Sequence, residues 1–198
     1  MFISIFATVL HLQTKKQMKN YQKLLLLLTL TGCAKEEPII PNEEELITTV
    51  KITFTPSQGG DARVFQYQDL DGEGGNAPTV TAEALQANTA YNMSVEFQNE
   101  STDPVDNITE EVQEEGVDHQ LFYSFTGGIG TLVYADQDDN GNPIGLQNTF
   151  TTGNASTGNM TLTLKHQPDK NAAGVKNGDI TNAGGETDVE VTFYVEVN

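Results

Sequence analysis

The chain has 198 residues, with 28 acidic and 10 basic side chains and a formal charge of −18 at pH 7. A surface this anionic repels nucleic acid and anionic lipid headgroups, so the composition argues against electrostatic binding to either. The charge either favours the binding of cations, calcium above all, or simply keeps an exposed protein soluble. Cys33 is the single cysteine, which excludes disulfides within the chain.

The N-terminal segment has the pattern of a secretory signal. Lys19 and Lys23 precede the short apolar run 24–30, and small residues follow it before Cys33. The run is too short for a membrane-spanning helix, which needs roughly 20 apolar residues. We therefore expect residues 1–32 to be a signal peptide, with Met18 as its natural start.

Residues 30–33, Leu-Thr-Gly-Cys, resemble the lipobox of bacterial lipoproteins. The resemblance implies that Cys33 becomes the first residue and carries three acyl chains. Each buried methylene contributes about 0.8 kcal/mol, so three chains anchor a protein durably. The next residues, Lys35, Glu36 and Glu37, resemble the tag that sends Bacteroidetes lipoproteins to the outer face of the outer membrane. The expected location is therefore the outer membrane, lipid-anchored and facing the exterior.

The remaining chain divides into a tether and a domain. Residues 33–45 contain Pro38, Pro41 and five glutamates, which predicts an extended, lipidated acidic tether. Residues 46–198 form the predicted domain. Four of the ten basic residues and none of the acids precede Cys33, so the 166 residues from Cys33 onward carry a formal charge of −22. This length suffices for one domain with its own core.

Alternating apolar and polar residues predict a series of short strands. The first begins at Leu46 and places Val50, Ile52 and Phe54 on one face. The other predicted strands cover residues 63–69, 91–98, 119–125, 131–135, 147–152, 160–166 and 188–197, with Asp188 facing outward. Gly-, Asn- and Asp-rich turns separate them. This pattern predicts an all-β fold, an antiparallel β-sandwich of about seven to nine strands, Greek-key or Ig-like, with one short helix.

The predicted helix lies within residues 103–116. Asp103, followed by Pro104, or alternatively Asp106 is expected to cap it, and Gly116 to end it. Apolar residues recur at helical spacing, namely Val105, Ile108 and Val112. The helix is interpreted as a lid or crossover between two strands, or as a solvated connector.

Segment 136–142 has the ligand spacing of a calcium loop, with oxygen-bearing side chains at positions one, three and five and glycine at six. The predicted ligands are Asp136, Asp138, Asn140 and the carbonyl of Asn142. Gln147 stands where an EF-hand has a bidentate glutamate, so another acid, for example from segment 184–188, has to complete the shell.

A second, weaker calcium loop is predicted at Asp69, Asp71 and Glu73, with glycine at position six. Asp-Gly and Asn-Gly pairs are also the commonest hairpin turns. The alternative for both loops is therefore that the acids close tight turns and face water.

Two histidines follow the signal, His119 and His166. His166 shares the parity of the apolar residues of its strand, which predicts a position inside or at the rim of the sandwich. Such a histidine is most often a satisfied core residue. If the two lie on neighbouring strands they could ligate haem or a transition metal.

The chain contains no Gly-x-Ser-x-Gly elbow, His-Glu-x-x-His pair or phosphate-binding glycine loop, and no tryptophan for stacking sugars. We therefore expect no catalytic site and predict that the protein is not an enzyme.

The whole chain after the signal resembles a family of small flavobacterial lipoproteins. The matching segments are the lipobox, the Lys-Glu-Glu tag and residues 69–72, 119–123, 134–136 and 185–188. Some members carry the label "type 1 periplasmic binding fold", which has two α/β lobes, whereas the pattern here predicts strands and one helix. The resemblance implies no particular activity.

Three functions are compatible with these features. The first is a surface-displayed, non-enzymatic binding or adhesion domain, stabilised by calcium, with a surface protein or glycan as ligand. The second is a haem or metal capture lipoprotein that uses His119 and His166. The third is an accessory subunit of a surface nutrient-uptake complex.

Overall fold

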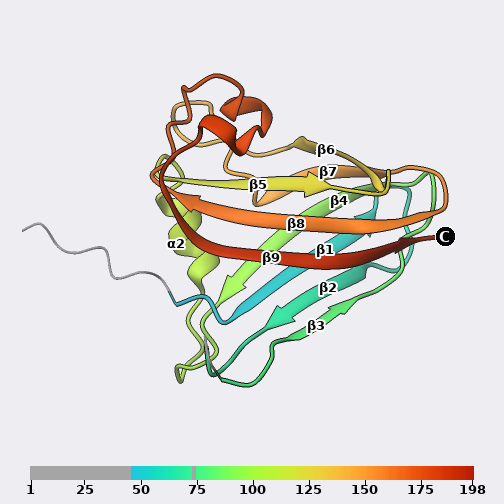
Figure 1. Ribbon diagram of the computed structural model, residues 1–198, viewed down its shortest axis with the longest axis horizontal. Helices are drawn as coiled ribbons and strands as arrows, with labels where there is room; N and C mark the ends of the chain where they lie inside the picture. The colour runs from blue at the N-terminus through green and yellow to red at the C-terminus, as the bar shows by residue number, and fades with distance from the viewer. Residues whose placement is uncertain (1–45, 73–74) are drawn as a thin grey trace, which may run out of the picture. The chain divides into compact units, whose positions relative to one another are not determined.

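The computed structural model describes residues 46–72 and 75–198, which form an all-β domain (Figure 1). The predicted signal, Cys33, the tether and Glu73 lie outside the described residues. The elements are β1 Thr49–Pro56, β2 Arg63–Gln68, β3 Thr79–Ala82, β4 Ala90–Gln98, α2 Ile108–Glu114, β5 His119–Phe125, β6 Gly130–Tyr134, β7 Gln147–Thr152, β8 Ser156–His166, η1 Val175–Asn177, η2 Ile180–Asn182 and β9 Glu186–Val197.

The strands form two antiparallel sheets. The larger has the order β3-β2-β1-β4-β7-β6 and the smaller has the order β5-β8-β9. The first three strands are successive antiparallel neighbours, and β4 then returns to pair with β1. This arrangement is a Greek key. The predicted antiparallel β-sandwich with one short helix is therefore confirmed.

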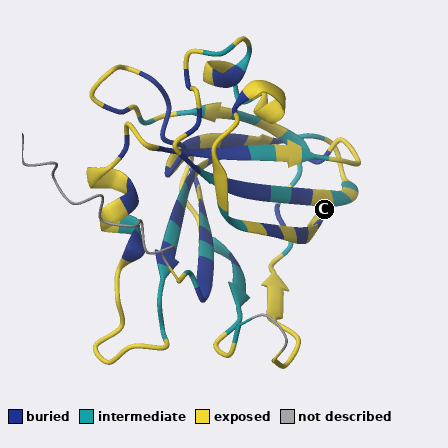
Figure 2. Ribbon diagram, turned by 60° about the vertical axis from the view of Figure 1, so that its left-hand side comes forward, coloured by how far each residue is buried: buried dark blue, intermediate teal, exposed yellow. Residues whose placement is uncertain are grey.

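The inner faces of both sheets share one hydrophobic core (Figure 2, dark blue). Val50, Ile52 and Phe54 are fully buried, as their alternation predicted. The ring centroid of Phe54 lies 4.6 Å from that of Phe65, and Phe65 lies 5.5 Å from Phe193 of the smaller sheet. Aromatic pairs at these separations add to the free energy gained by burial and join the two sheets.

The helix begins later than predicted. Asn99 and Asp106 exchange two backbone hydrogen bonds, which hold residue 106 extended, so the cap is Asn107 and not Asp103 or Asp106. Ile108 and Val112 are buried as expected, but Val105 is exposed. The helix covers one end of β4, where the Thr109 hydroxyl accepts from the Phe97 N–H and donates to the Phe97 carbonyl. Among the described residues no helix is long and apolar enough to span a membrane.

Two further predictions about strands were wrong. Leu46 is 55% exposed because β1 begins only at Thr49. Asp188 was expected to face outward, but the register of β8 and β9 shifts between Leu164 and Lys165, so residue 188 is the extra residue of a β-bulge. Bulges redirect side chains, and the Asp188 side chain is only 10% exposed. Strand β3 was missed because it has only four residues, and all four are exposed.

Candidate functional site

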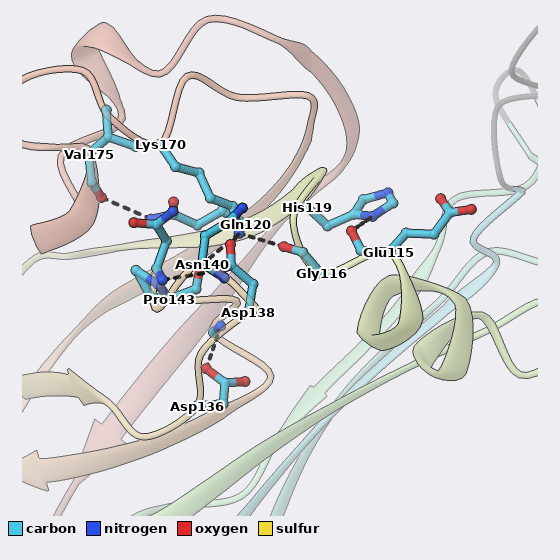
Figure 3. Close-up of polar contacts among 12 residues, drawn as sticks. Glu115, Gly116, His119, Gln120, Asp136, Asp138, Asn140, Pro143, Lys170 and Val175 are labelled. Atoms are coloured by element: carbon cyan, nitrogen blue, oxygen red, sulfur yellow. Dashed lines mark hydrogen bonds and ion pairs between the residues drawn. The ribbon is translucent and has the colours of Figure 1, made fainter.

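A buried lysine lies at the centre of the loops beyond one end of the smaller sheet. Lys170 is 4% exposed, and its Nζ donates to Asp138 Oδ2 at 2.9 Å, the Gly116 carbonyl at 2.6 Å and the Pro143 carbonyl at 3.0 Å (Figure 3). An ammonium has three donors, and each has an acceptor. The lysine therefore joins the end of the α2 segment, the loop 136–143 and its own loop.

Asp138 occupies the third position of the predicted calcium loop. Its Oδ1 accepts the backbone N–H groups of Asn140 and Asn142, each at 2.9 Å, while Oδ2 binds Lys170. Burial acts to raise the pKa of Asp138, but the Asn142 N–H and the Lys170 ammonium outweigh it and keep the pKa below its usual value. For Lys170 burial dominates, and the pKa of the ammonium is lowered despite Asp138. In this structure a protein cation therefore binds the carboxylate that the sequence assigned to calcium.

Two other predicted ligands, Asp136 and the Asn142 carbonyl, form hydrogen bonds within the same loop. Asp136 accepts the N–H groups of Gly145 at 2.7 Å and Gln147 at 2.9 Å. The Asn142 carbonyl accepts the Asp138 N–H, and Gly141 has a φ of +76°, which suits glycine at the tight bend. Asn140 is exposed. Among the described residues no three His, Cys, Asp or Glu side chains are arranged to hold a metal ion.

A cleft of about 300 Å³ lies between this loop and α2. Gln113 and Glu114 line it from the helix, and residues 136–139 line it from the loop. Ile144 and Leu146 contribute apolar surface. The cleft is therefore a concave surface with acidic and apolar walls, a combination typical of binding sites.

The second predicted loop has the geometry of a turn where it is described. Asp69 Oδ1 accepts the Gly72 N–H at 3.0 Å. Asp71 Oδ2 accepts the backbone and side-chain N–H groups of Asn76, and the bond from the Asn76 backbone is the main reason that the pKa of Asp71 is lowered. Among the described residues, no hydrogen bond or ion pair joins this loop to residues 136–142.

The structure brings the two histidines together. His119 and His166 face each other across β5 and β8, and their rings stack with centroids 4.8 Å apart and planes 9° apart. His119 Nδ1 lies 3.2 Å from the Glu115 carbonyl, and Nε2 lies 3.9 Å from Asp188 Oδ2, which the bulge turns inward. Burial lowers the pKa of His119, which favours the neutral ring. His166 is 8% exposed, as its parity predicted.

Sequence reasoning missed two residues of these sites. Lys170 lies in a polar loop with no periodic pattern, and its partner is 32 positions away. Asp188 lies in a strand whose alternation is regular in the sequence, and only the bulge moves it beside His119. The one sequence signal that points to Lys170 is that basic residues are rare in the described part of the chain. Each of them is therefore a candidate partner for the many acids.

The buried ion pair yields a direct test. Removing one partner of a buried pair leaves the other charge uncompensated and costs about 3–5 kcal/mol. Lys170→Met should therefore lower the free energy of unfolding by about that amount in urea denaturation. Lys51→Met breaks an exposed pair, whose side chains are 38% and 43% accessible, and should cost no more than about 1 kcal/mol. Lys170→Met/Asp138→Asn removes both charges but keeps an oxygen that accepts from the N–H groups of Asn140 and Asn142, so it should cost less than Lys170→Met alone. Equal losses for the two single lysine variants would contradict the central role of Lys170.

Comparisons with protein-family models, with curated proteins and with solved structures found no match. The site is therefore interpreted from its own geometry. That geometry comprises a turn held by a buried lysine, an acidic cleft beside it and a stacked histidine pair.

Proposed function

We propose that the protein is a lipid-anchored protein of the outer-membrane surface whose β-sandwich is a non-enzymatic binding or adhesion domain. The observation that carries the binding role is the cleft between α2 and residues 136–139. Its acidic wall is fixed by the three hydrogen bonds of Lys170, and fixed walls bind ligands at a lower entropic cost. Support for the anchor comes from the lipobox and the charge, because so acidic a domain needs a lipid to stay at a membrane.

The location can be tested on intact cells. With native Cys33, the protein should fractionate with membranes and be digested by a protease added outside. Cys33→Ala should release it from the membrane, whereas alanines at Lys35, Glu36 and Glu37 should keep the lipid but remove access to the external protease. A soluble wild-type protein would contradict the anchor. A membrane-bound protein that resists the protease until cells are lysed would contradict surface display.

Calcium binding by the Asp136 loop stays a prediction, and it now involves competition with Lys170. Calcium prefers carboxylate and carbonyl oxygens, and the ammonium of Lys170 is surrounded by three oxygens of this kind. An ion at Asp138 has to replace that ammonium or bind on the cleft side of the loop.

Thermal melts of residues 33–198 carrying Cys33→Ser, in calcium and then in excess chelator, test this competition. Calcium should raise the melting temperature by mass action on the folded state, and Asp136→Ala should abolish the shift. Lys170→Ala should melt lower without calcium and gain a larger shift with it, because the oxygens around the ammonium become free. Identical melts in both solutions for all three proteins would show that these acids only close the turn.

A metal-capture role for His119 and His166 is the second candidate, because the two rings stack. To hold one small ion, the two stacked rings have to tilt until a nitrogen of each turns toward that ion, and rings that lie side by side cannot bind opposite faces of a haem iron. The geometry therefore favours a transition metal ion over haem. The pair is buried, at 1% and 8% exposure, whereas the acidic cleft is open, so this role ranks second.

Zinc and hemin titrations distinguish these possibilities. Zinc should raise the melting temperature of the wild type, and His119→Gln and His166→Gln should each remove that rise. Hemin should produce no Soret shift that depends on either histidine. A zinc response that survives both substitutions would exclude the pair as the metal site.

A further inference from the structure

A second concave surface lies where the two sheets diverge. β5 and β6 are consecutive in the chain but belong to different sheets, joined by residues 126–129. Between them is a groove of about 580 Å³. Tyr123 and Phe125 line it from β5, Gly130, Leu132 and Tyr134 line it from β6, and residues 176–178 lie at its rim.

The β6 wall carries backbone groups that no other described residue binds. In an antiparallel ladder, opposed residues alternate between bonded and non-bonded pairs. Gly153 N–H donates to the Ile129 carbonyl and Ala135 N–H donates to the Gln147 carbonyl, which sets the bonded pairs with β7 at odd-numbered residues of β6. The N–H and C=O groups of the three even-numbered residues, Gly130, Leu132 and Tyr134, therefore face the groove.

The β5 wall also carries backbone groups that point away from its neighbouring strand, β8. Thr126 N–H donates to the Asn159 carbonyl and Gln167 N–H donates to the Asp118 carbonyl, so the bonded pairs with β8 fall at even-numbered residues. Leu121, Tyr123 and Phe125 turn their backbone groups away from β8. Leu121 donates to the Ile144 carbonyl and accepts from Tyr134 Oη, so its edge is closed. Among the described residues, none pairs with the backbone of Tyr123 or Phe125.

On the opposite side of the sandwich, where the edge strands are β3 and β9, backbone pairing closes the gap between the two sheets. There Leu85 forms a parallel bridge with Val197, donating to the Glu196 carbonyl and accepting from the Asn198 N–H. In the described part of the chain, no such segment pairs with residues 123–125 of β5 or 130–132 of β6. Unpaired edges of this kind accept an added strand.

The side chains define which strand fits. The hydroxyls of Tyr123 and Tyr134 already donate to the carbonyls of Gly145 and Leu121, so their rings offer apolar surface to the groove. Lys176 is exposed at the rim and has no ion-pair partner among the described residues. In a domain this acidic, an unpaired ammonium at the mouth of an apolar groove selects a carboxylate.

We propose that this groove, defined by Tyr123, Phe125, Gly130, Leu132 and Lys176, binds an extended segment of a partner protein by strand addition. The segment pairs its backbone with the free edges, places small apolar side chains between Tyr123 and Leu132, and presents an acidic residue to Lys176. This role rests on the proposed binding function, but its test requires neither the lipid nor calcium.

The test uses residues 33–198 carrying Cys33→Ser and the capped peptide Val-Thr-Val-Glu-Val as probe, followed by amide NMR and hydrogen exchange. Binding should shift and protect the amides of Tyr123, Phe125, Gly130 and Leu132. The same peptide with N-methyl groups on alternate residues should not bind, because it cannot pair with an edge. The matched peptide Val-Thr-Val-Lys-Val should bind more weakly.

Lys176→Ala should lower the affinity for Val-Thr-Val-Glu-Val about two- to fivefold, which is the range for one exposed ion pair. It should not lower the affinity for Val-Thr-Val-Lys-Val. Lys51→Ala removes the same charge from β1, at a position that does not line the groove, and should change neither affinity. The proposal is overturned if the peptide protects no groove amide at millimolar concentration, or if the N-methylated peptide binds equally well. Groove shifts produced instead by uronic-acid oligosaccharides would also overturn it. A calcium-independent melt would challenge the Asp136 prediction alone.

Discussion

The buried charge of Lys170 is the constraint on which the loop end of this protein depends. An ammonium removed from water costs several kcal/mol unless each proton has an acceptor, and here the acceptors come from two loops, the one after α2 and the one between β6 and β7. The residues around Gly116, Asp138 and Pro143 therefore have to meet in one arrangement. The same arrangement fixes the wall of the acidic cleft. A charged residue thus gives definite shape to loops that have little hydrophobic surface of their own.

The sandwich was predictable because, in most of its strands, the alternation of apolar and polar residues reflects which face is buried. Val50, Ile52 and Phe54 alternate with polar residues, and burial of that face follows from alternation alone. The prediction failed where the environment gives no alternation. All of β3 is exposed, and Leu46 precedes the first ladder pair. The start of α2 depended on the bridge between Asn99 and Asp106. This bridge joins backbone groups, so the identities of the two side chains do not predict it.

The sites were less predictable because they depend on contacts between distant parts of the chain. The acids of residues 136–142 have calcium-loop spacing, yet spacing cannot reveal a lysine 32 positions away that binds the same oxygen. Likewise, the parity of His166 predicted burial but not its neighbour, since alternation determines faces and not strand order. A one-residue bulge then decided where Asp188 points. Each of these outcomes depends on which distant segments meet, and a single sequence does not encode that locally.

The lysine network and the open groove are parts of one arrangement. Pro143 accepts a hydrogen bond from Lys170, and the next residue, Ile144, accepts one from Leu121 of β5. By holding residues 143–145 in place, the buried ion pair closes one end of the seam between β5 and β6. Beyond Leu121 no described segment continues that closure, and the edges of both strands are left with unpaired backbone groups. The position of the buried charge therefore sets where the sheets are sealed, and consequently how long an added strand the groove can accept.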